Sequence, residues 1–199
     1  RDNLSQSEII ADTDRYLNEL KTDYIDLLLI HWPKERVDYV ETFNAFSQVQ
    51  KAGKVKNFGV SNFPSDLLKH TQKKVQSTGV EIITNQFEYH PSLDQSELVE
   101  ECFNLGVSVT AYSPLAQGQD LDLDSVKSVA KKRNTTPANI ILAWIRAKGI
   151  VSIPKSSSKE HIKSNYESLK IDLDKDEIGL IDKESSQDNR IVNPKFSMF

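Results

Sequence analysis

The chain carries a short apolar run, Ile25-Asp26-Leu27-Leu28-Leu29-Ile30, that leads directly into His31-Trp32-Pro33. Four later segments repeat this plan of an apolar run followed by a polar cluster, at residues 58–62, 82–88, 107–114 and 150–156. Parallel strands are buried on both faces and therefore read as continuous apolar runs. Because a helix-like segment separates each run from the next, the order is that of repeated βαβ units. The sequence therefore predicts an α/β fold, a barrel of parallel strands and helices.

Apolar residues at three- and four-residue spacing predict helices around these strands. The expected helices cover residues 7–20, 37–52, 65–75, 97–105, 125–133, 136–149, 157–169 and 175–185. Thr136-Pro137 is a strong start signal, because a hydroxyl cap precedes a proline in the first turn. Ser157-Ser158-Lys159-Glu160 matches a capping box that opens another helix. The tail, residues 187–199, has no period and is expected to lie over the surface.

Composition narrows the class of protein. With 199 residues, 38% hydrophobic residues and a net charge of −4, the chain has the composition of a soluble globular protein. This charge gives no reason to expect a nucleic acid or an anionic membrane as partner. The single cysteine, Cys102, excludes an internal disulfide and fits a cytoplasmic location. No apolar run approaches the ~20 residues that cross a bilayer, and no secretory signal is expected.

The N-terminus leads directly into a helical pattern, with no strand before it. A complete (β/α)8 barrel needs about 250 residues. We therefore expect residues 1–199 to form a single, partial barrel domain that supplies about five of the eight strands, with the first three βα units absent.

The ends of barrel strands meet at one face, where barrel enzymes carry their chemistry. Six strand-end side chains are therefore expected to share a site: His31, Ser61, Asn62, Gln86, Tyr112 and Lys155. His31 could donate a hydrogen bond to a substrate oxygen, accept a proton or bind a metal, or it could simply bond a neighbouring backbone group. A metal is not expected, because His90 is the only other strand-end histidine. His70 and His161 fall in helical segments and are expected to be solvated.

Lys155 is followed by three serines that open a helix, and a helix N-terminus attracts anions. This pattern indicates a phosphate site. The same residues would also be found where a lysine ends a strand and ordinary capping residues follow it. The hydroxyl and amide groups of Ser61-Asn62 and Asn85-Gln86 could bind a planar amide, and Tyr112 could stack on a flat ring. Each residue alone is also a common strand terminator. As a set they outline a site for a nicotinamide dinucleotide.

Five motifs in order now show a resemblance to a known family. The motifs are His31-Trp32-Pro33, Gly59-Val60-Ser61-Asn62-Phe63, Asn85-Gln86-x-Glu88-Tyr89-His90-Pro91, Ala111-Tyr112-Ser113-Pro114-Leu115 and Ile153-Pro154-Lys155-Ser156. Together they resemble the aldo-keto reductase family over nearly the whole chain. Residues 20–33 and 188–194 are most similar to the bacterial 2,5-diketo-gluconate reductase group, which also reduces methylglyoxal-type aldehydes.

The resemblance implies a (β/α)8 TIM barrel that uses NADPH to reduce an aldehyde or ketone to the alcohol. His31 would orient the substrate carbonyl as the catalytic residue, and Trp32 would wall the substrate pocket. The cofactor would be held by Ser61, Asn62, Gln86, Tyr112, Ser113, Leu115, Lys155, Ser156, Ser158, His161 and Asn165. Within that set, the first three would hold the carboxamide and Tyr112 would stack on the nicotinamide. Lys155, Ser156 and Ser158 would grip the 2′-phosphate, and Asn165 would touch the adenine. The resemblance further implies a small carbonyl substrate and a monomer when complete.

The chain departs from the family pattern in two respects. Of the catalytic Asp, Tyr, Lys and His of the family, only the histidine is matched, as His31, so the chain alone is expected to be nearly inactive. His161 stands where the family usually has an arginine that clamps the 2′-phosphate, and Ser164 replaces an acidic residue that reads the adenine. A neutral imidazole binds phosphate less well than a guanidinium, so NAD is a possible cofactor beside NADP.

Two other classes remain open from the sequence. A non-catalytic, nucleotide-binding barrel with a regulatory or structural role would keep the same pocket. A barrel enzyme for phosphate esters would explain Lys155 but not the amide cluster.

Overall fold

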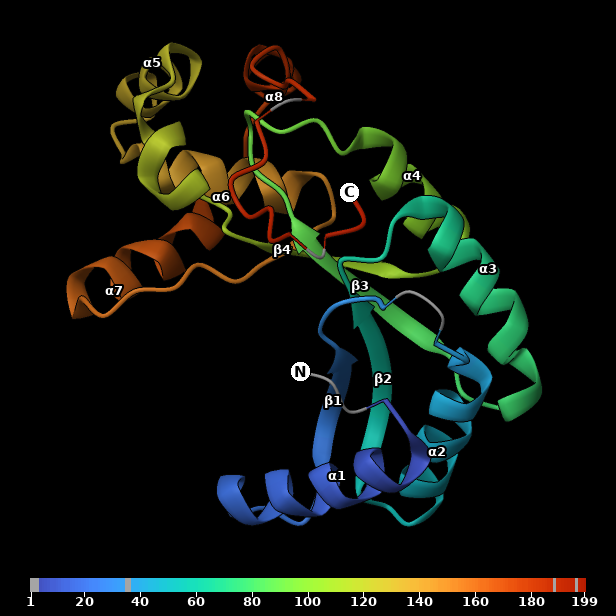
Figure 1. The fold of residues 1–199 in the computed structure, drawn as a ribbon. Coiled ribbons are helices and arrows are strands. Elements are labelled where there is room, and N and C mark those ends of the chain that lie inside the picture. Colours follow the sequence, from blue (N-terminus) through green and yellow to red (C-terminus); the bar gives the residue numbers. More distant parts are fainter. Residues whose placement is uncertain (1–3, 35–36, 188, 196) are drawn as a thin grey trace. The chain divides into compact units, whose positions relative to one another are not determined.

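The computed structural model describes residues 4–34, 37–187, 189–195 and 197–199 (Figure 1). Helices and strands alternate along the chain as predicted. The strands are β1 (Ile25–Ile30), β2 (Val55–Ser61), β3 (Ile82–Glu88), β4 (Ser108–Tyr112) and β5 (Val151–Ser152). The α-helices are α1 (Gln6–Leu20), α2 (Tyr39–Lys51), α3 (Ser65–Val75), α4 (Ser96–Asn104), α5 (Asp124–Lys132), α6 (Pro137–Ala147), α7 (Lys159–Glu167) and α8 (Lys175–Asp182). Short 3-10 helices follow at η1 (Gln76–Thr78), η2 (Ala116–Asp122) and η3 (Ser168–Lys170).

The strands form a five-stranded sheet in the order β1-β2-β3-β4-β5, which is also their order in the sequence. The pairs β1–β2, β2–β3 and β4–β5 are all parallel, with Ile25 opposite Val55 in the first and Thr110 opposite Val151 in the last. Sequential parallel strands joined by helices are the repeating unit of a (β/α)8 barrel. The predicted α/β fold with five parallel strands is therefore confirmed, as part of such a barrel.

The chain divides into two compact units. Unit 1 comprises Arg1–Gln86, Glu100–Ser108 and Pro194–Phe199, and unit 2 comprises Phe87–Val99 and Val109–Asn193. The expectation of a single domain over the whole chain stays a prediction. Residues 1–3 and 188, which belong to the predicted domain and to the family-like tail, lie outside the described residues.

Aromatic rings fill the core of unit 1. Phe46 of α2 stacks on Phe58 of β2 with ring centroids 4.3 Å apart, and Phe43 packs edge-on against Phe46. All three side chains are buried. Burial of each ring contributes roughly 1.5–3 kcal/mol, so this cluster fixes α2 against β2.

Helix α6 forms the centre of unit 2, because its apolar residues are buried nearly all round. Trp144 stacks on Tyr89 at 5.3 Å and donates a 2.8 Å hydrogen bond from Nε1 to Asp182 of α8. The predicted start of α6 is confirmed, since the Thr136 hydroxyl accepts from the Asn139 N–H at 3.2 Å, with Pro137 in the first turn.

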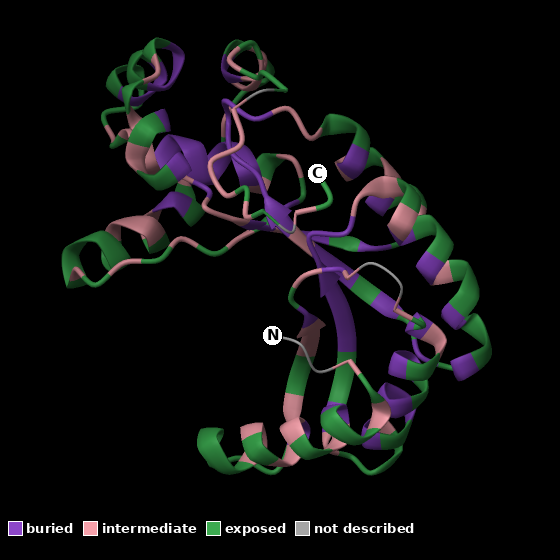
Figure 2. Cartoon of the chain, in the orientation of Figure 1, coloured by how far each residue is buried: buried purple, intermediate pink, exposed green. Residues whose placement is uncertain are grey.

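The edge strands differ from the prediction. Strand β1 was expected to be buried on both faces, yet Figure 2 shows exposed and intermediate residues along most of it, and Leu27 is 40% exposed. The run at 150–156 forms only the two-residue strand β5, in which Val151 is 58% exposed. In the described sheet, β1 pairs only with β2 and β5 only with β4, so each lacks a neighbour that would cover its side chains.

The predicted capping box is also wrong, because the helix begins one residue later than the box at Ser157 requires. Ser158 is the N-cap of α7, and its hydroxyl accepts from the His161 N–H at 3.2 Å. The same hydroxyl donates a hydrogen bond to the Glu160 carboxylate. In the predicted box, that carboxylate would instead accept from the backbone N–H of Ser157. Within the described residues, no helix is both long and apolar enough to pass through a membrane.

Candidate functional site

His31 lies immediately after β1, and its backbone is held by the neighbouring strand. The side-chain amide of Asn62, just beyond β2, donates a 2.9 Å hydrogen bond to the His31 carbonyl. Asn62 is fully buried and has a φ of 62°, a left-handed conformation that asparagine tolerates better than most residues. The His31 side chain itself is exposed, so it can meet a ligand while its backbone stays fixed.

The residues predicted to hold a carboxamide lie together at these strand ends. The Ser61 hydroxyl donates to the Gln86 carbonyl at 2.7 Å, and the Asn62 N–H donates to the same carbonyl at 2.8 Å. The Asn62 amide also donates to the Ser61 oxygen at 3.0 Å. Much of the hydrogen-bonding capacity of Ser61 and Asn62 is therefore used inside unit 1, which the sequence did not predict.

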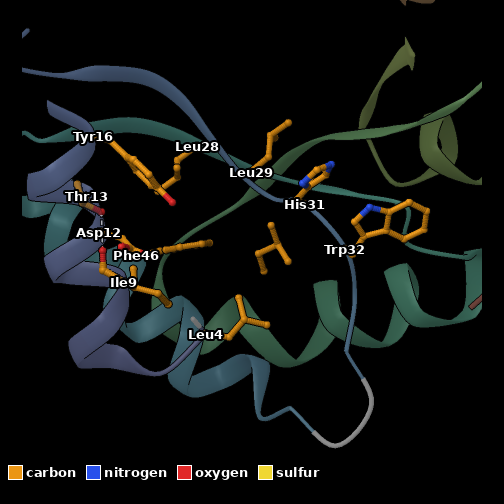
Figure 3. A pocket seen from close by; sticks show the side chains of 11 residues that line it. Leu4, Ile9, Asp12, Thr13, Tyr16, Leu28, Leu29, His31, Trp32 and Phe46 are labelled. Atoms are coloured by element: carbon orange, nitrogen blue, oxygen red, sulfur yellow. Dashed lines mark hydrogen bonds between the residues drawn. The ribbon is translucent and has the colours of Figure 1, made fainter. Parts of the chain in front are cut away.

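A cavity of about 280 Å³ lies beside His31 in unit 1 (Figure 3). Its walls come from helix α1 and strand β1, and both His31 and Trp32 line it, with ring centroids 6.4 Å apart. Helix α1 supplies the polar side chains of Asp12, Thr13 and Tyr16, and apolar residues such as Leu28 and Leu29 complete the lining. Trp32 is thus a pocket wall, although its contact with a substrate stays a prediction.

A second cavity, also of about 280 Å³, lies wholly within unit 2. Five residues predicted to bind the cofactor line it: Leu115, Lys155, Ser156, His161 and Asn165. The remaining lining residues are Leu121, Thr136, Pro137, Ala138 and Ser164. The cavity therefore combines an apolar wall with two basic side chains, a hydroxyl and the first residues of α6.

Ser158 lies outside the described lining of this cavity but holds residues that do line it. Its N–H donates to the Ser156 oxygen at 3.1 Å, and its hydroxyl caps α7, the helix that carries His161 and Asn165. Ser158 is absent from the described lining, so the predicted direct contact with phosphate stays untested. His161, expected to be solvated, is exposed and at the same time lines the cavity.

Tyr112 and Ser113 end strand β4 in unit 2 without joining the described lining of this cavity. Burial raises the pKa of Tyr112 to about 12, so its ring is a neutral phenol. Ser113 has a φ of 47°, and it opens a connection in which Ala116 and Gln117 also adopt left-handed conformations. The sequence predicted neither this strained connection nor the 3-10 helix η2 that it enters.

Sequence reasoning also missed a buried charged cluster in unit 2. His90 contacts both Glu88 at the end of β3 and Asp120 of η2, and none of the three is more than 2% exposed. The only local signal was the Glu-x-His spacing after a strand, because the third member is thirty residues away.

Comparison with known proteins identifies the class. Residues 1–185 match the model of the aldo/keto reductase family. The chain therefore belongs to the aldo/keto reductase family, whose members are oxidoreductases that act on carbonyl groups. The resemblance read from the five motifs is confirmed.

Particular relatives are carbonyl reductases. The chain is 35% identical over 191 residues to glyoxal reductase of Bacillus subtilis, covering 96% of this chain and 67% of that protein. It is 34% identical over 197 residues to methylglyoxal reductase DkgB of Escherichia coli O157:H7, covering 98% of this chain and 72% of that protein. The chain spans 62% to 72% of the length of these and similar curated relatives.

Solved structures agree with this assignment. A candidate 2,5-diketo-D-gluconic acid reductase B superposes with a TM-score of 0.92 and 30% identity, covering 98% of this chain and 69% of that one. An aldo-keto reductase of Bombyx mori in complex with NADP superposes with a TM-score of 0.87 and 27% identity, covering 96% of this chain and 67% of that one.

Proposed function

We propose that this chain is the nucleotide-binding and substrate-orienting part of an NADPH-dependent reductase of small aldehydes or ketones, of the methylglyoxal or 2,5-diketo-gluconate type. The observation that carries the proposal is the unit 2 cavity, because Leu115 and four residues of the segment 155–165, all predicted to bind the cofactor, line it together. The relatives that reduce glyoxal and methylglyoxal, and the structural neighbour that contains NADP, support the same assignment.

The chemistry of the cavity fits the adenosine end of such a cofactor. Lys155 and His161 are the basic groups, and the Ser156 hydroxyl is a donor suited to a phosphate oxygen. Leu115 and Leu121 offer apolar surface to a purine, and Asn165 adds an amide that can bond its edge. When bound, NADPH supplies the hydride that reduces the carbonyl carbon.

The protein's contribution to the reaction would be orientation and polarisation of the substrate carbonyl. His31 would hold the carbonyl oxygen of the substrate by a hydrogen bond, which polarises the bond that is reduced. The bond from Asn62 to the His31 carbonyl keeps the backbone of His31 at a fixed place on the strand end. Trp32 would exclude water from the same side and limit the size of the substrate.

Cofactor preference would depend on His161. An imidazole binds a 2′-phosphate less well than the guanidinium that the family usually has at this position, so NADH would serve as a second cofactor beside NADPH. We further propose a cytoplasmic location and a monomeric state for the complete enzyme.

Binding and turnover test different parts of the proposal. Quenching of protein fluorescence by NADPH should saturate for the 199-residue chain, and Lys155→Ala should weaken it at least about tenfold. Turnover of methylglyoxal by this chain should be slow, because a missing general acid alone costs about 10²–10⁴-fold. Absence of saturable binding would overturn the cofactor assignment, and rates like those of a complete reductase would overturn the expected inactivity.

A further inference from the structure

The buried cluster of Glu88, His90 and Asp120 joins three separate segments of unit 2. His90 Nε2 lies 3.1 Å from a Glu88 oxygen, and Nδ1 lies 3.2 Å from Asp120 Oδ2 and 3.1 Å from the Ser92 oxygen. Ser92 also donates its hydroxyl to Asp120 Oδ1 at 2.6 Å and its N–H to Asp120 Oδ2 at 3.0 Å. Every member is buried, so no substrate can reach this Ser–His–Asp arrangement and a nucleophilic role is ruled out.

The hydrogen-bond partners determine where the protons lie. Nε2 of His90 faces a carboxylate oxygen, and Nδ1 faces another carboxylate oxygen and a hydroxyl whose hydrogen is already donated to Asp120. Neither ring nitrogen therefore faces a donor. A neutral imidazole would turn one lone pair toward a carboxylate in a buried site, whereas an imidazolium donates from both nitrogens.

Both carboxylates are held in the ionised form by further donors. Glu88 accepts from the N–H groups of Ile191 and Val192, each at 2.9 Å. Burial alone would raise the pKa of Glu88 and of Asp120. Hydrogen bonds from His90 lower both pKa values, together with the Ile191 and Val192 N–H groups at Glu88 and with Ser92 at Asp120. Burial opposes the charge on His90, yet its bonds to Asp120 and Glu88 raise its pKa above the usual value.

The surrounding charges favour the same protonation state. Arg190 of the C-terminal segment interacts favourably with Glu88, although its own burial lowers the pKa of the guanidinium. Tyr112 of β4 is the other titratable group close to this arginine and to Glu88, and it is a neutral phenol. Two carboxylates, one imidazolium and one guanidinium therefore sum to no net charge, and loss of the His90 proton leaves an uncompensated buried anion.

The cluster holds two segments at the end of β3. One is the C-terminal segment, residues 189–192, which is attached through Glu88 and through a 2.6 Å bond from the Asn189 amide to the Ser92 oxygen. The other is η2, which is attached through Asp120. Leu121, next to Asp120, is a wall of the unit 2 cavity. Ala116 and Gln117, a few residues before Asp120, adopt left-handed conformations, and such strained backbone persists only where the surrounding structure holds it in place.

We propose that His90 is a positioning residue held as an imidazolium, a clasp that fixes the C-terminal segment and the η2 wall of the nucleotide cavity and opens when His90 loses its proton. The part that concerns nucleotide affinity rests on the function proposed above. The stabilising effect of His90 is complete below about pH 6.5, the pKa of an unfolded histidine, and is lost as the pH rises through its raised folded-state value. At the acid end, the contributions of Glu88 and Asp120 are lost as the pH falls through their lowered values.

The direct test is a pH titration of the ¹⁵N-labelled histidine rings of the full chain by NMR. We expect both ring nitrogens of His90 to stay protonated above about pH 6.5, the usual pKa of a histidine. The N–H groups of Ile191 and Val192 should lose protection from exchange over the same pH range in which His90 deprotonates. A neutral His90 at about pH 7, or protection that does not follow its titration, would overturn the clasp.

A variant separates the clasp from the proposed function. His90→Gln should raise amide exchange at Ile191 and Val192 about ten- to hundredfold and weaken NADP⁺ binding in parallel, whereas His70→Gln should change neither. If NADP⁺ binds neither the wild type nor His90→Gln at any pH, while the titration of His90 and the amide exchange come out as expected, the proposed function fails and the clasp stands. If NADP⁺ binds equally to wild type and His90→Gln, the nucleotide part of this inference fails and the proposed function stands. Should His90→Gln not fold, the titration of the wild-type chain still decides.

Discussion

The side-chain amide of Asn62 reaches the backbone carbonyl of His31 at 2.9 Å, and so one strand end fixes the position of the next. Replacing Asn62 with alanine removes this donor from a buried acceptor and places a Cβ-bearing residue without a polar side chain at a φ of 62°. Asn62→Ala should therefore lower the free energy of unfolding by about 2–3 kcal/mol. Urea denaturation measures this change.

Asn62→Gly is the matched control, because glycine tolerates the left-handed backbone but also lacks the amide. The free energy of unfolding should fall by about 1 kcal/mol less in Asn62→Gly than in Asn62→Ala, because the left-handed conformation costs alanine about that much. Equal unfolding free energies for wild type and Asn62→Ala would show that the bond to His31 contributes nothing.

Gly59 of β2 is closely surrounded by the neighbouring strands. A Cβ at this position would lie 2.6 Å from side-chain atoms of Leu29 and Thr84 and 2.8 Å from the Thr84 carbonyl oxygen. Backbone cannot move aside cheaply, so Gly59→Ala should destabilise the chain by about 2–3 kcal/mol. Gly179 of α8 has no heavy atom within 4 Å of such a Cβ, and Gly179→Ala should stabilise by about 0.5–1 kcal/mol. Thermal unfolding of the two variants should shift in opposite directions, and a shared direction would refute the packing argument.

Glu177 connects α8 to the end of α5. The Arg133 guanidinium donates to both of its oxygens, at 2.8 and 2.6 Å, and together with Lys132 it lowers the pKa of Glu177 to about 2. This stabilisation is present above the unfolded pKa near 4.3 and is lost as the pH falls through about 2. Glu177→Gln should therefore cost on the order of 2 kcal/mol at neutral pH, reduced by the partial exposure of Arg133, and progressively less on acidification. A difference between wild type and variant that is unchanged from about pH 7 to about pH 3 would contradict this account.

His161 is predicted to set the choice between the two nicotinamide cofactors. A guanidinium in its place can bind a phosphate through two hydrogen bonds at any pH. His161→Arg should therefore tighten the binding of NADPH about tenfold and leave that of NADH nearly unchanged. Competition between the two cofactors in fluorescence titrations provides the measurement, and an equal effect on both would place His161 away from the 2′-phosphate.

The order of helices and strands could be predicted from the sequence, because it depends on local spacing of apolar residues. The burial of β1 could not, since Leu27 is apolar in the sequence whether or not a neighbouring strand covers it. The same holds for β5, since Val151 in the strand and Ile153 just after it look like core residues and are exposed. Burial depends on sheet neighbours, which local pattern does not specify.

The candidate site was partly predictable for the same reason. Lys155 and His161 lie near each other in the sequence and share a cavity, as the helix start between them indicates. The clasp at His90 joins residues that are thirty and about a hundred positions apart, and no local pattern reports such contacts. The hydrogen bond from the Ser61 hydroxyl to the backbone carbonyl of Gln86 could not be predicted either, because its acceptor belongs to another strand.

The central claim is that the unit 2 cavity holds the adenosine end of a nicotinamide nucleotide, and NMR of the ¹⁵N-labelled chain during a titration with NADP⁺ tests it most directly. The account predicts that the backbone signals of Ser156, His161 and Asn165 move first and saturate together, while that of His70 stays in place. Saturable shifts confined to other parts of the chain, or none at millimolar NADP⁺, would contradict it.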